Sequence, residues 1–252
     1  MITIRPIPAF NDNYIWHLQE NGEHWVVDPG DAAPVMAALQ GQRLTGILLT
    51  HHHFDHTGGV SALTSAFDCP VYGPATIEGV THPLEEGSRL TLLGRHCRVF
   101  EVPGHTLDHI ALLMEDGAER YLFCGDTLFA AGCGRLFEGT PDQMHQSLSR
   151  LAALPSHTLV YCTHEYTLAN LAFALAAEPQ NQELIERQQA ARAQRDRGEP
   201  TLPSTIGLER ATNPFLRTAE PSVRQQALQR GASASADTVE IFATLRQWKD
   251  VF

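Results

Sequence analysis

The chain has 252 residues, of which 43% are hydrophobic, and its 18 Lys and Arg stand against 29 Asp and Glu, which gives a formal net charge of −11. This composition is typical of a globular protein that buries a sizeable core. It disfavours nucleic acid as a partner, because phosphate binding draws its free energy from clustered cations. No apolar run approaches the roughly 20 residues that span a bilayer, and residues 1–6 lack the features of a signal peptide. We therefore expect a soluble, unexported chain that binds no membrane.

Cysteines and histidines are distributed differently along the chain. The five cysteines include no Cys-x-x-Cys pair, which fits neither a disulfide framework nor a thiolate zinc site and favours a reducing cytoplasm. The thirteen histidines are unevenly spread, and four of them lie between His51 and His56. This short stretch is therefore the first place to look for chemistry.

Up to about residue 168, short apolar runs alternate with Gly, Pro and Asp. The expected strands are Tyr14–Leu18, His24–Val27, Thr45–Leu49, Val71–Tyr72, Cys97–Val102, Ile110–Met114, Tyr121–Cys124 and Thr158–Cys162. The expected helices are Ala33–Leu39, Gly59–Ala66, capped by Thr57, and Pro141–Leu154. Strands interleaved with short helices predict a layered α/β domain rather than a helical bundle or an all-β sandwich.

After residue 168 the sequence becomes rich in helix formers and charges. The expected helices are Ala169–Ala177, Glu183–Arg197, Ala219–Gly231 and Ala236–Asp250. The segment Gly198–Pro203 interrupts them, and charges of alternating sign over 186–197 indicate a solvated helix face. We therefore expect two domains, residues 1–168 and a mostly helical part at 169–252.

The stretch His51–His56 directly follows the expected strand at 45–49. Alternate residues of an extended segment point the same way, so His51, His53 and Asp55 can converge while His56 turns toward a neighbouring point. Imidazole and carboxylate are ligands that suit zinc and similar ions. A merely exposed polar loop would leave the flanking strand and the Gly58-Gly59 pair unexplained.

Three further polar residues each follow an apolar strand, namely His105, Asp126 and His164. Sites in α/β folds lie beyond the carboxyl ends of strands, so these loops can meet in one cleft. Taken singly, His105 or His164 would be an ordinary hydrogen-bonded histidine. Together with the four residues of the first loop they make seven ligands, which are too many for one open tetrahedral zinc but suit two metals that share a carboxylate.

The pattern His51-x-His53-x-Asp55-His56, with three downstream ligands, resembles the metallo-β-lactamase superfamily, whose αβ/βα sandwich carries a binuclear metal site at one edge. Over the whole chain the sequence resembles glyoxalase II, the hydroxyacylglutathione hydrolase family. The matching segments are Asn11–Tyr14, Val27–Gly30, Cys124–Phe129, Gly132–Thr140, His164–Thr167 and Asn213–Arg217. The metal motif is shared by many hydrolases, whereas the segment 133–139 and the helical tail are specific to this branch.

The resemblance implies a role for each matching ligand. It assigns one metal to His51, His53 and His105, the second to Asp55, His56 and His164, and a bridging position to Asp126. The ions implied are divalent; zinc is the first expectation, and the same ligands accept iron or manganese. Asp28 either orients a ligand imidazole or belongs to an ordinary Asp-Pro-Gly turn.

The resemblance also implies glutathione contacts at Arg135, Phe137, Tyr166, Arg246 and Lys249. Each of these alone would be interpreted as a surface residue. Glutathione carries two carboxylates and one ammonium, so an acidic protein needs local cations to bind it, and Arg is well suited to a carboxylate. We therefore expect the helical part at 169–252 to bind glutathione.

Two residues depart from the family pattern. Phe137 stands where many relatives have Tyr, so a hydroxyl hydrogen bond is absent or replaced there. Asp108 stands where the His-Thr-x-Gly-His pattern has Gly, which puts the backbone between His105 and His109 in question if positive φ is needed. We interpret His109 as a structural or supporting residue rather than a ligand.

The implied reaction is hydrolysis of S-(2-hydroxyacyl)glutathione, such as S-D-lactoylglutathione, to glutathione and a 2-hydroxy acid such as D-lactate, in methylglyoxal detoxification. Two metals sharing a water lower its pKa toward about 7, and we expect Asp55 to aim the resulting hydroxide at the thioester carbonyl. Asp126 would hold both ions. A thiol with a pKa near about 8.5 leaves as the thiolate, so no general acid is needed.

Other functions of this superfamily fit less well. An RNA-processing enzyme would need a basic surface, a β-lactamase would lack the tail, and a flavin-linked di-iron enzyme would need a longer chain. A structural metal site would favour cysteine ligands. A thioesterase for other thiols, or a lactonase, is the alternative that stays open. We expect the chain to act in the cytoplasm as a monomer.

Overall fold

The computed structural model describes residues 1–252 and divides into two compact units. The first unit contains Met1–Glu101, Asp108–Gly125 and Tyr161–His164. The second contains Val102–Leu107, Asp126–Val160 and Glu165–Phe252. Each unit is thus assembled from segments that are distant in the sequence. The division at residue 168 into two domains stays a prediction.

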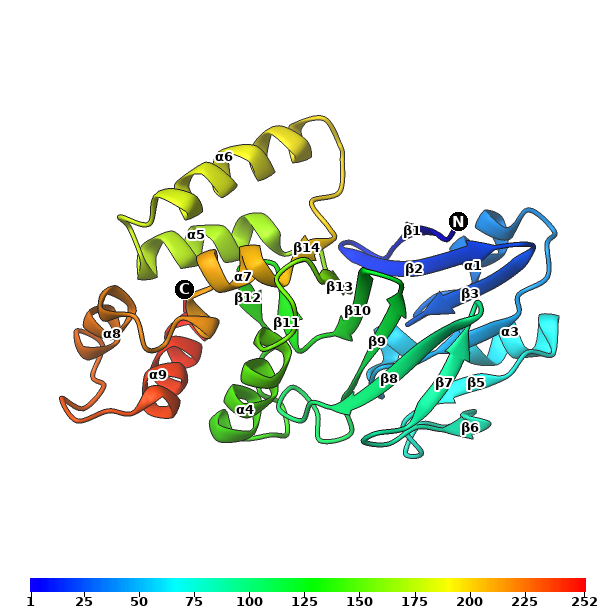
Figure 1. The fold of residues 1–252 in the computed structure, drawn as a ribbon, viewed down its shortest axis with the longest axis horizontal. Coiled ribbons are helices and arrows are strands. Elements are labelled where there is room, and N and C mark those ends of the chain that lie inside the picture. The colour runs from blue at the N-terminus through cyan, green and yellow to red at the C-terminus, as the bar shows by residue number, and fades with distance from the viewer. The chain divides into compact units, whose positions relative to one another are not determined.

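The first unit contains a six-stranded sheet in the order β1-β2-β3-β4-β5-β6. Its strands are β1 (Thr3–Ala9), β2 (Asn13–Glu20), β3 (Glu23–Val27), β4 (Gly46–Leu48), β5 (Val71–Gly73) and β6 (His82–Pro83). β1 to β3 are antiparallel, whereas β3 to β6 run parallel. Helices α1 (Ala32–Leu39) and α3 (Val60–Phe67) accompany this sheet (Figure 1). Val35 and Leu63 of these helices share one buried cluster with Val26 and Ile47 of the strands, so the helices cover one face.

An antiparallel ribbon of four strands also belongs to the first unit. It consists of β7 (Arg89–Leu92), β8 (Arg95–Glu101), β9 (Ile110–Asp116) and β10 (Glu119–Gly125). Its aromatic face meets the first sheet, since the Tyr161 ring lies 4.8 Å from Trp16 of β2 and 5.2 Å from Phe123 of β10. The Trp16 indole also donates to the Cys162 carbonyl at 3.0 Å. Two sheets packed through buried aromatics, with helices outside, confirm the expected layered α/β architecture.

The second unit is mostly helical. Its helices are α4 (Pro141–Ala152), α5 (Thr167–Ala177), α6 (Gln182–Asp196), α7 (Ile206–Thr212), α8 (Pro221–Leu228) and α9 (Thr238–Asp250), with a 3-10 turn at Pro214–Leu216. Thr140 and Gln143 form a capping box at α4, and Asn181 and Asp237 cap α6 and α9 with their side chains. Phe173, which is fully buried, packs against rings on other helices.

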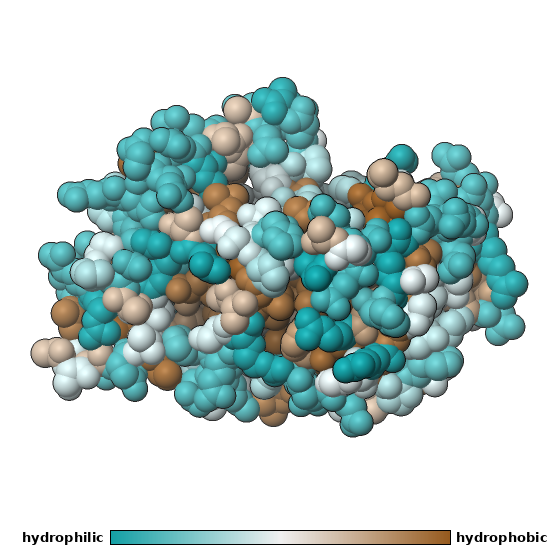
Figure 2. Space-filling model, in the orientation of Figure 1, coloured by the Kyte–Doolittle hydropathy of each residue, from teal (hydrophilic) through white to brown (hydrophobic).

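Helix α6 has the solvated character expected from its charges. Its buried residues are Leu184 and Ala191, and the helix is largely hydrophilic in Figure 2. None of the helices is both long and apolar enough to cross a bilayer.

The expected strands and helices are all present with boundaries shifted by a few residues. The capping role given to Thr57 is wrong. Thr57 ends a separate short helix, α2 (Phe54–Thr57), where its hydroxyl donates to the His53 carbonyl at 3.1 Å, and Gly59 precedes α3 instead. The two glycines after Thr57 allow this tight succession, because a Cβ on Gly59 would lie 2.5 Å from the Pro29 carbonyl oxygen.

Candidate metal centre

The loop after β4 is packed directly on the loop after β3. A Cβ on Gly30 would lie 1.9 Å from the Asp55 carbonyl oxygen, so only glycine allows this approach. Asp28 adopts φ +53 and accepts hydrogen bonds from the Thr50 amide and hydroxyl, each at 2.8 Å. Its Oδ2 lies 3.1 Å from His56 Nδ1. Of the two interpretations of Asp28, the structure favours a carboxylate that orients an imidazole.

Asp55, His56 and His164 form one group whose ligand atoms all lie within 4.8 Å of one another. Asp55 Oδ2 is 3.5 Å from His56 Nε2 and 3.4 Å from His164 Nε2. The outer nitrogens face carboxylates, because His164 Nδ1 lies 2.8 Å from Asp12 Oδ1 and His56 Nδ1 faces Asp28. Carboxylates placed behind imidazoles turn the opposite nitrogen toward a metal. These three residues could therefore hold one metal ion between them.

The sequence did not single out Asp12 or Asn13 as site residues. Asn13 donates from Nδ2 to Asp55 Oδ2 at 3.0 Å, and it also forms a β-bridge with His164. The available signal was the segment 11–14, which matched the family without suggesting a role. Asp12 and Asn13 therefore fix the orientation of His164 and Asp55 through hydrogen bonds.

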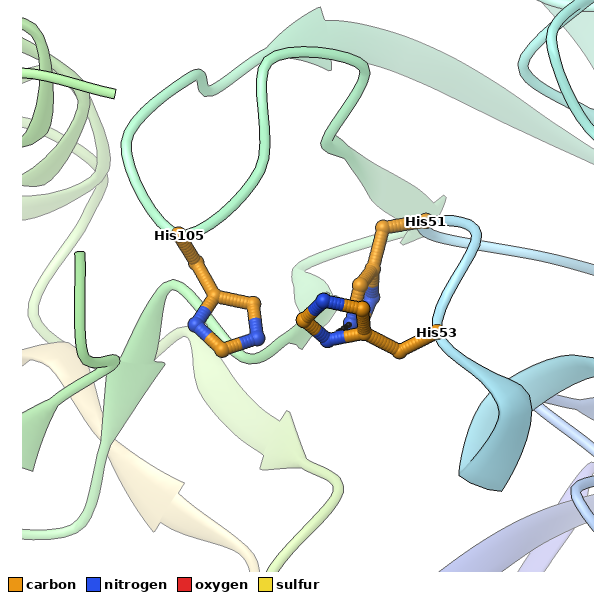
Figure 3. A group of neighbouring side chains, drawn as sticks. All are labelled: His51, His53 and His105. Atoms are coloured by element: carbon orange, nitrogen blue, oxygen red, sulfur yellow. Dashed lines mark hydrogen bonds between the residues drawn. The ribbon is translucent and has the colours of Figure 1, made fainter. Parts of the chain in front are cut away.

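Of the remaining predicted ligands, His51 and His53 belong to the first unit, and His105 and Asp126 belong to the second. Figure 3 draws the imidazoles of His51, His53 and His105. His51 Nε2 lies 3.2 Å from His53 Nδ1, and His105 Nε2 lies 3.4 Å from Asp126 Oδ2. A buried set of imidazoles and carboxylates is the donor chemistry of zinc and similar divalent ions.

His105 is oriented by a backbone oxygen. Its Nδ1 donates to the Arg135 carbonyl at 2.7 Å, so Nε2 is the nitrogen that remains available to bind a metal ion. Gly134 makes this possible, because a Cβ there would lie 2.0 Å from the Asp126 carbonyl oxygen and 3.1 Å from His105 Nδ1. The segment Gly132–Thr140 therefore supports a candidate metal ligand with its backbone.

One of the two departures from the family pattern, Asp108, has a structural account. Asp108 does not adopt positive φ, so an Asp fits this backbone. Its carboxylate lies 2.9 Å from His52 Nδ1 and accepts from the Thr76 hydroxyl at 2.8 Å. His109 is fully buried and stacks on His51 at 4.5 Å, which agrees with a supporting role.

Of the five predicted glutathione contacts, two share a binding partner, and the other three have separate neighbours. Arg135 Nε and Arg246 Nη2 both bind Asp250 Oδ1, at 3.2 and 3.0 Å, and the Phe137 ring lies 5.2 Å from His105. Tyr166 packs edge-on against Phe129, and Lys249 Nζ lies 5.5 Å from the Phe173 ring.

Arg246 corrects the interpretation of these five as surface residues. It is only 6% exposed, and its guanidinium donates to the Cys133 carbonyl at 2.9 Å. Partial burial and the neighbouring Arg246 charge lower the pKa of Lys249. Arg135 and Phe137, by contrast, are exposed, as expected.

Comparison with known proteins agrees with this site. Residues 11–164 match the metallo-beta-lactamase superfamily, and residues 165–252 match the C-terminus of hydroxyacylglutathione hydrolase. ETHE1 from Myxococcus xanthus shares the fold, with a TM-score of 0.66 at 21% identity over 98% of this chain and 91% of that one. TTHA1623 in a di-iron-bound form has a TM-score of 0.61 at 29% identity over 84% of this chain and 100% of that one. The fold and the metal-binding cluster are thus those of the metallo-beta-lactamase superfamily, and the expected sandwich is confirmed.

Full-length relatives narrow this class. Hydroxyacylglutathione hydrolases from Pseudomonas paraeruginosa (strain DSM 24068 / PA7) and Hahella chejuensis (strain KCTC 2396) are 56% and 51% identical, each over 100% of both chains. The chain belongs to the hydroxyacylglutathione hydrolase family.

Proposed function

We propose that this chain hydrolyses S-(2-hydroxyacyl)glutathione, with S-D-lactoylglutathione as the first expectation, to glutathione and a 2-hydroxy acid. Family membership supports the reaction, and Arg135 supplies the structural observation that carries it. The Arg135 carbonyl orients His105, while its guanidinium is 56% exposed and pairs with the partly exposed Asp250. One residue can therefore connect a metal ligand with a substrate carboxylate.

We infer two divalent ions per chain, zinc in the first place. His51, His53 and His105 would hold one, Asp55, His56 and His164 the other, and Asp126 would contact both. When bound, such ions supply an acidified water and polarise a carbonyl oxygen. Asp12, Asp28 and Thr50 keep the imidazoles and the loop in place.

The chain's own residues favour a reaction without a covalent intermediate. All five cysteines are buried, and burial raises the pKa of Cys97 to about 12 and of Cys133 to about 11. A thiol held protonated inside the protein is a poor nucleophile. We propose water as the group that attacks the thioester carbonyl, and Asp55 accepts a hydrogen bond from Asn13 that fixes its carboxylate for orienting that water.

The leaving group explains why the site needs no dedicated proton donor. A thiol has a pKa near about 8.5 and departs as the thiolate, whereas an alkoxide needs a proton. Glutathione carboxylates would be bound by the guanidinium of Arg135 and the ammonium of Lys249, with Arg246 placed behind them by its bond to Asp250. Tyr166 and Phe137 offer exposed aromatic surface to the tripeptide.

The test compares the steady-state hydrolysis of four substrates: S-D-lactoylglutathione, an acyl-CoA, a lactone, and the oxygen ester in which oxygen replaces the thioester sulfur of S-D-lactoylglutathione. The metal content is measured in each preparation. We expect the highest kcat/KM for the glutathione thioester and a much lower kcat for the oxygen ester. A higher kcat/KM for the acyl-CoA or the lactone would contradict the proposal. Equal kcat for ester and thioester, with chemistry rate-limiting, would contradict thiolate departure as the reason for the missing acid.

We also propose that the chain works as a monomer in the cytoplasm. The support is chemical, since the five cysteines are all buried thiols, which suit a reducing compartment. Sedimentation of the metal-loaded protein tests the monomer, and a dimer at micromolar concentration would contradict it.

A further inference from the structure

A short hairpin connects Asp126 with Arg135. It consists of β11 (Leu128–Phe129) and β12 (Gly132–Cys133). Its turn contains Ala131 at φ +54, a left-handed conformation that costs free energy in a residue with a Cβ. The Gly134 amide donates to the Thr127 carbonyl at 3.2 Å, which closes the hairpin directly beside Asp126. The turn is therefore joined to both ends of the segment by a short antiparallel pairing.

Three buried side chains from the helical part of the second unit bind this turn. Glu209 of α7 accepts a hydrogen bond from the Ala131 amide at 2.8 Å. Asn170 of α5 donates to the Ala130 carbonyl at 3.1 Å. Asn213, just after α7, donates to the carbonyls of Phe129 and Gly132, at 3.2 and 2.8 Å. The Ala131 amide and three backbone carbonyls of the turn therefore have hydrogen-bond partners within the protein.

Glu209 is a fully buried carboxylate, and its remaining contacts neutralise it. Arg187 Nη2 donates to Oε1 at 2.5 Å, the Ser204 hydroxyl donates to the same oxygen, and Asn213 Nδ2 donates to Oε2 at 3.0 Å. A buried ion pair is seldom more stabilising than apolar residues of similar volume. Its presence is explained if the carboxylate is needed to hold a strained amide in place.

We propose that Glu209, Asn213 and Asn170 are positioning residues for the metal centre, acting through the hairpin. The hairpin fixes the backbone of Asp126 at one end and the Arg135 carbonyl that orients His105 at the other. The helical part thus acts on two predicted metal ligands, besides its expected contacts with glutathione. The kinetic part of this inference rests on the proposed function, whereas the metal-binding part does not.

The first test is Glu209→Gln, which keeps the shape of the side chain but cannot accept all four hydrogen bonds. We expect zinc to be released to a chelator about tenfold faster than from the wild type. We expect kcat to fall severalfold with KM within about twofold, since none of the three positioning residues is itself an expected glutathione contact. Glu183→Gln, an exposed change on α6, is the matched control and leaves both values unchanged.

A rescue separates positioning from general stability. Ala131→Gly removes the cost of the left-handed turn, so adding it to Glu209→Gln should restore part of the zinc retention and of kcat. Ala130→Gly, at a position without positive φ, should restore neither. If Glu209→Gln does not fold, Asn170→Ala removes one turn contact while leaving the Glu209 network intact, and a faster zinc release is again expected.

Two results would overturn the inference. One is a lower melting temperature in Glu209→Gln or Asn170→Ala with unchanged zinc release and kcat, which would make the network purely structural. The other is a rise in KM alone, which would place its effect on substrate. A wild-type protein that binds zinc but does not hydrolyse the glutathione thioester would reject the proposed function, and zinc release would still decide this inference.

Discussion

At the scale of single residues, Asp126 is the predicted ligand whose loss should affect the whole metal centre. Its Oδ2 lies 3.4 Å from His105 Nε2. We expect Asp126→Ala to lose both metals and all turnover, because one carboxylate serves two ions. Elemental analysis of the purified variant measures this, and two retained metals per chain would reject the bridging assignment.

Asp108 gives a second prediction at this scale, and it separates stability from ligation. Asp108→Gly, which restores the family residue, removes the contacts with His52 and Thr76 and adds backbone freedom. We expect the free energy of unfolding to fall by about 1–2 kcal/mol with metal content unchanged. Urea unfolding measures the loss, and Thr76→Val should reproduce part of it. A more stable Asp108→Gly variant would contradict this account.

The candidate ligands can be recognised in the sequence because most follow local rules. Four of them lie within the single loop from His51 to His56, and the others directly follow apolar strands. Asp12 could not be predicted in the same way, because its partner His164 is 152 positions away. A residue that acts behind a ligand leaves no local pattern.

At the scale of elements, helix α9 should affect substrate binding and stability through different residues. Lys249→Met removes a charge while keeping apolar contact with Phe173, and we expect KM to rise about fivefold, equivalent to about 1 kcal/mol. Arg246→Met should also lower the free energy of unfolding by about 1–3 kcal/mol, because the buried Cys133 carbonyl loses its donor.

Kinetics and denaturation of both variants check this difference, with metal content measured throughout. Arg192→Met, at an exposed position of α6, serves as the control for loss of a cation. An unchanged KM in Lys249→Met would show that this ammonium does not contact substrate.

Periodicity identified the elements with long apolar runs and missed those that depend on neighbours. β1 was missed because Pro6 and Pro8 lie within it. These prolines are tolerated since β1 is an edge strand, paired with β2 alone. The buried position of Arg246 was missed for a related reason, because Cys133 lies 113 positions away. Helical spacing places both Arg246 and Lys249 on α9 but does not reveal which one is covered.

At the scale of the whole molecule, the arginines explain how an acidic chain provides cations locally. Several are consumed in internal ion pairs, among them Arg187 with Glu209, Arg217 with Glu178 and Arg95 with Glu20. Arg135 keeps more than half of its side chain exposed although it shares Asp250 with Arg246. The net charge of −11 predicted the need for such a residue, whereas the fold shows that Arg135 keeps its side chain accessible.

Global stability should depend on pH through a histidine pair remote from the metal centre. His17 and His24 lie on β2 and β3, and His17 Nε2 is 3.0 Å from His24 Nδ1. Burial, followed by the charges of His24 and of Arg5 on β1, lowers the pKa of His17 to about 4, and burial also lowers the pKa of His24. Both rings are therefore neutral in the folded protein at neutral pH.

The unfolded chain binds a proton at His17 near pH 6.5, whereas the folded protein does so only near pH 4. The neutral His17 ring therefore contributes its full stabilisation above pH 6.5, and this contribution is lost as the pH falls toward 4. Between pH 7 and pH 5, we expect the free energy of unfolding of the metal-free wild type to fall by about 1–3 kcal/mol more than that of the metal-free His17→Gln variant. The amide introduced by this substitution cannot titrate and can still donate to His24, while the ligand histidines contribute equally to both proteins. Urea unfolding at the two pH values measures the difference. Equal losses in the two proteins would show that His17 is protonated in the folded state as readily as in the unfolded chain.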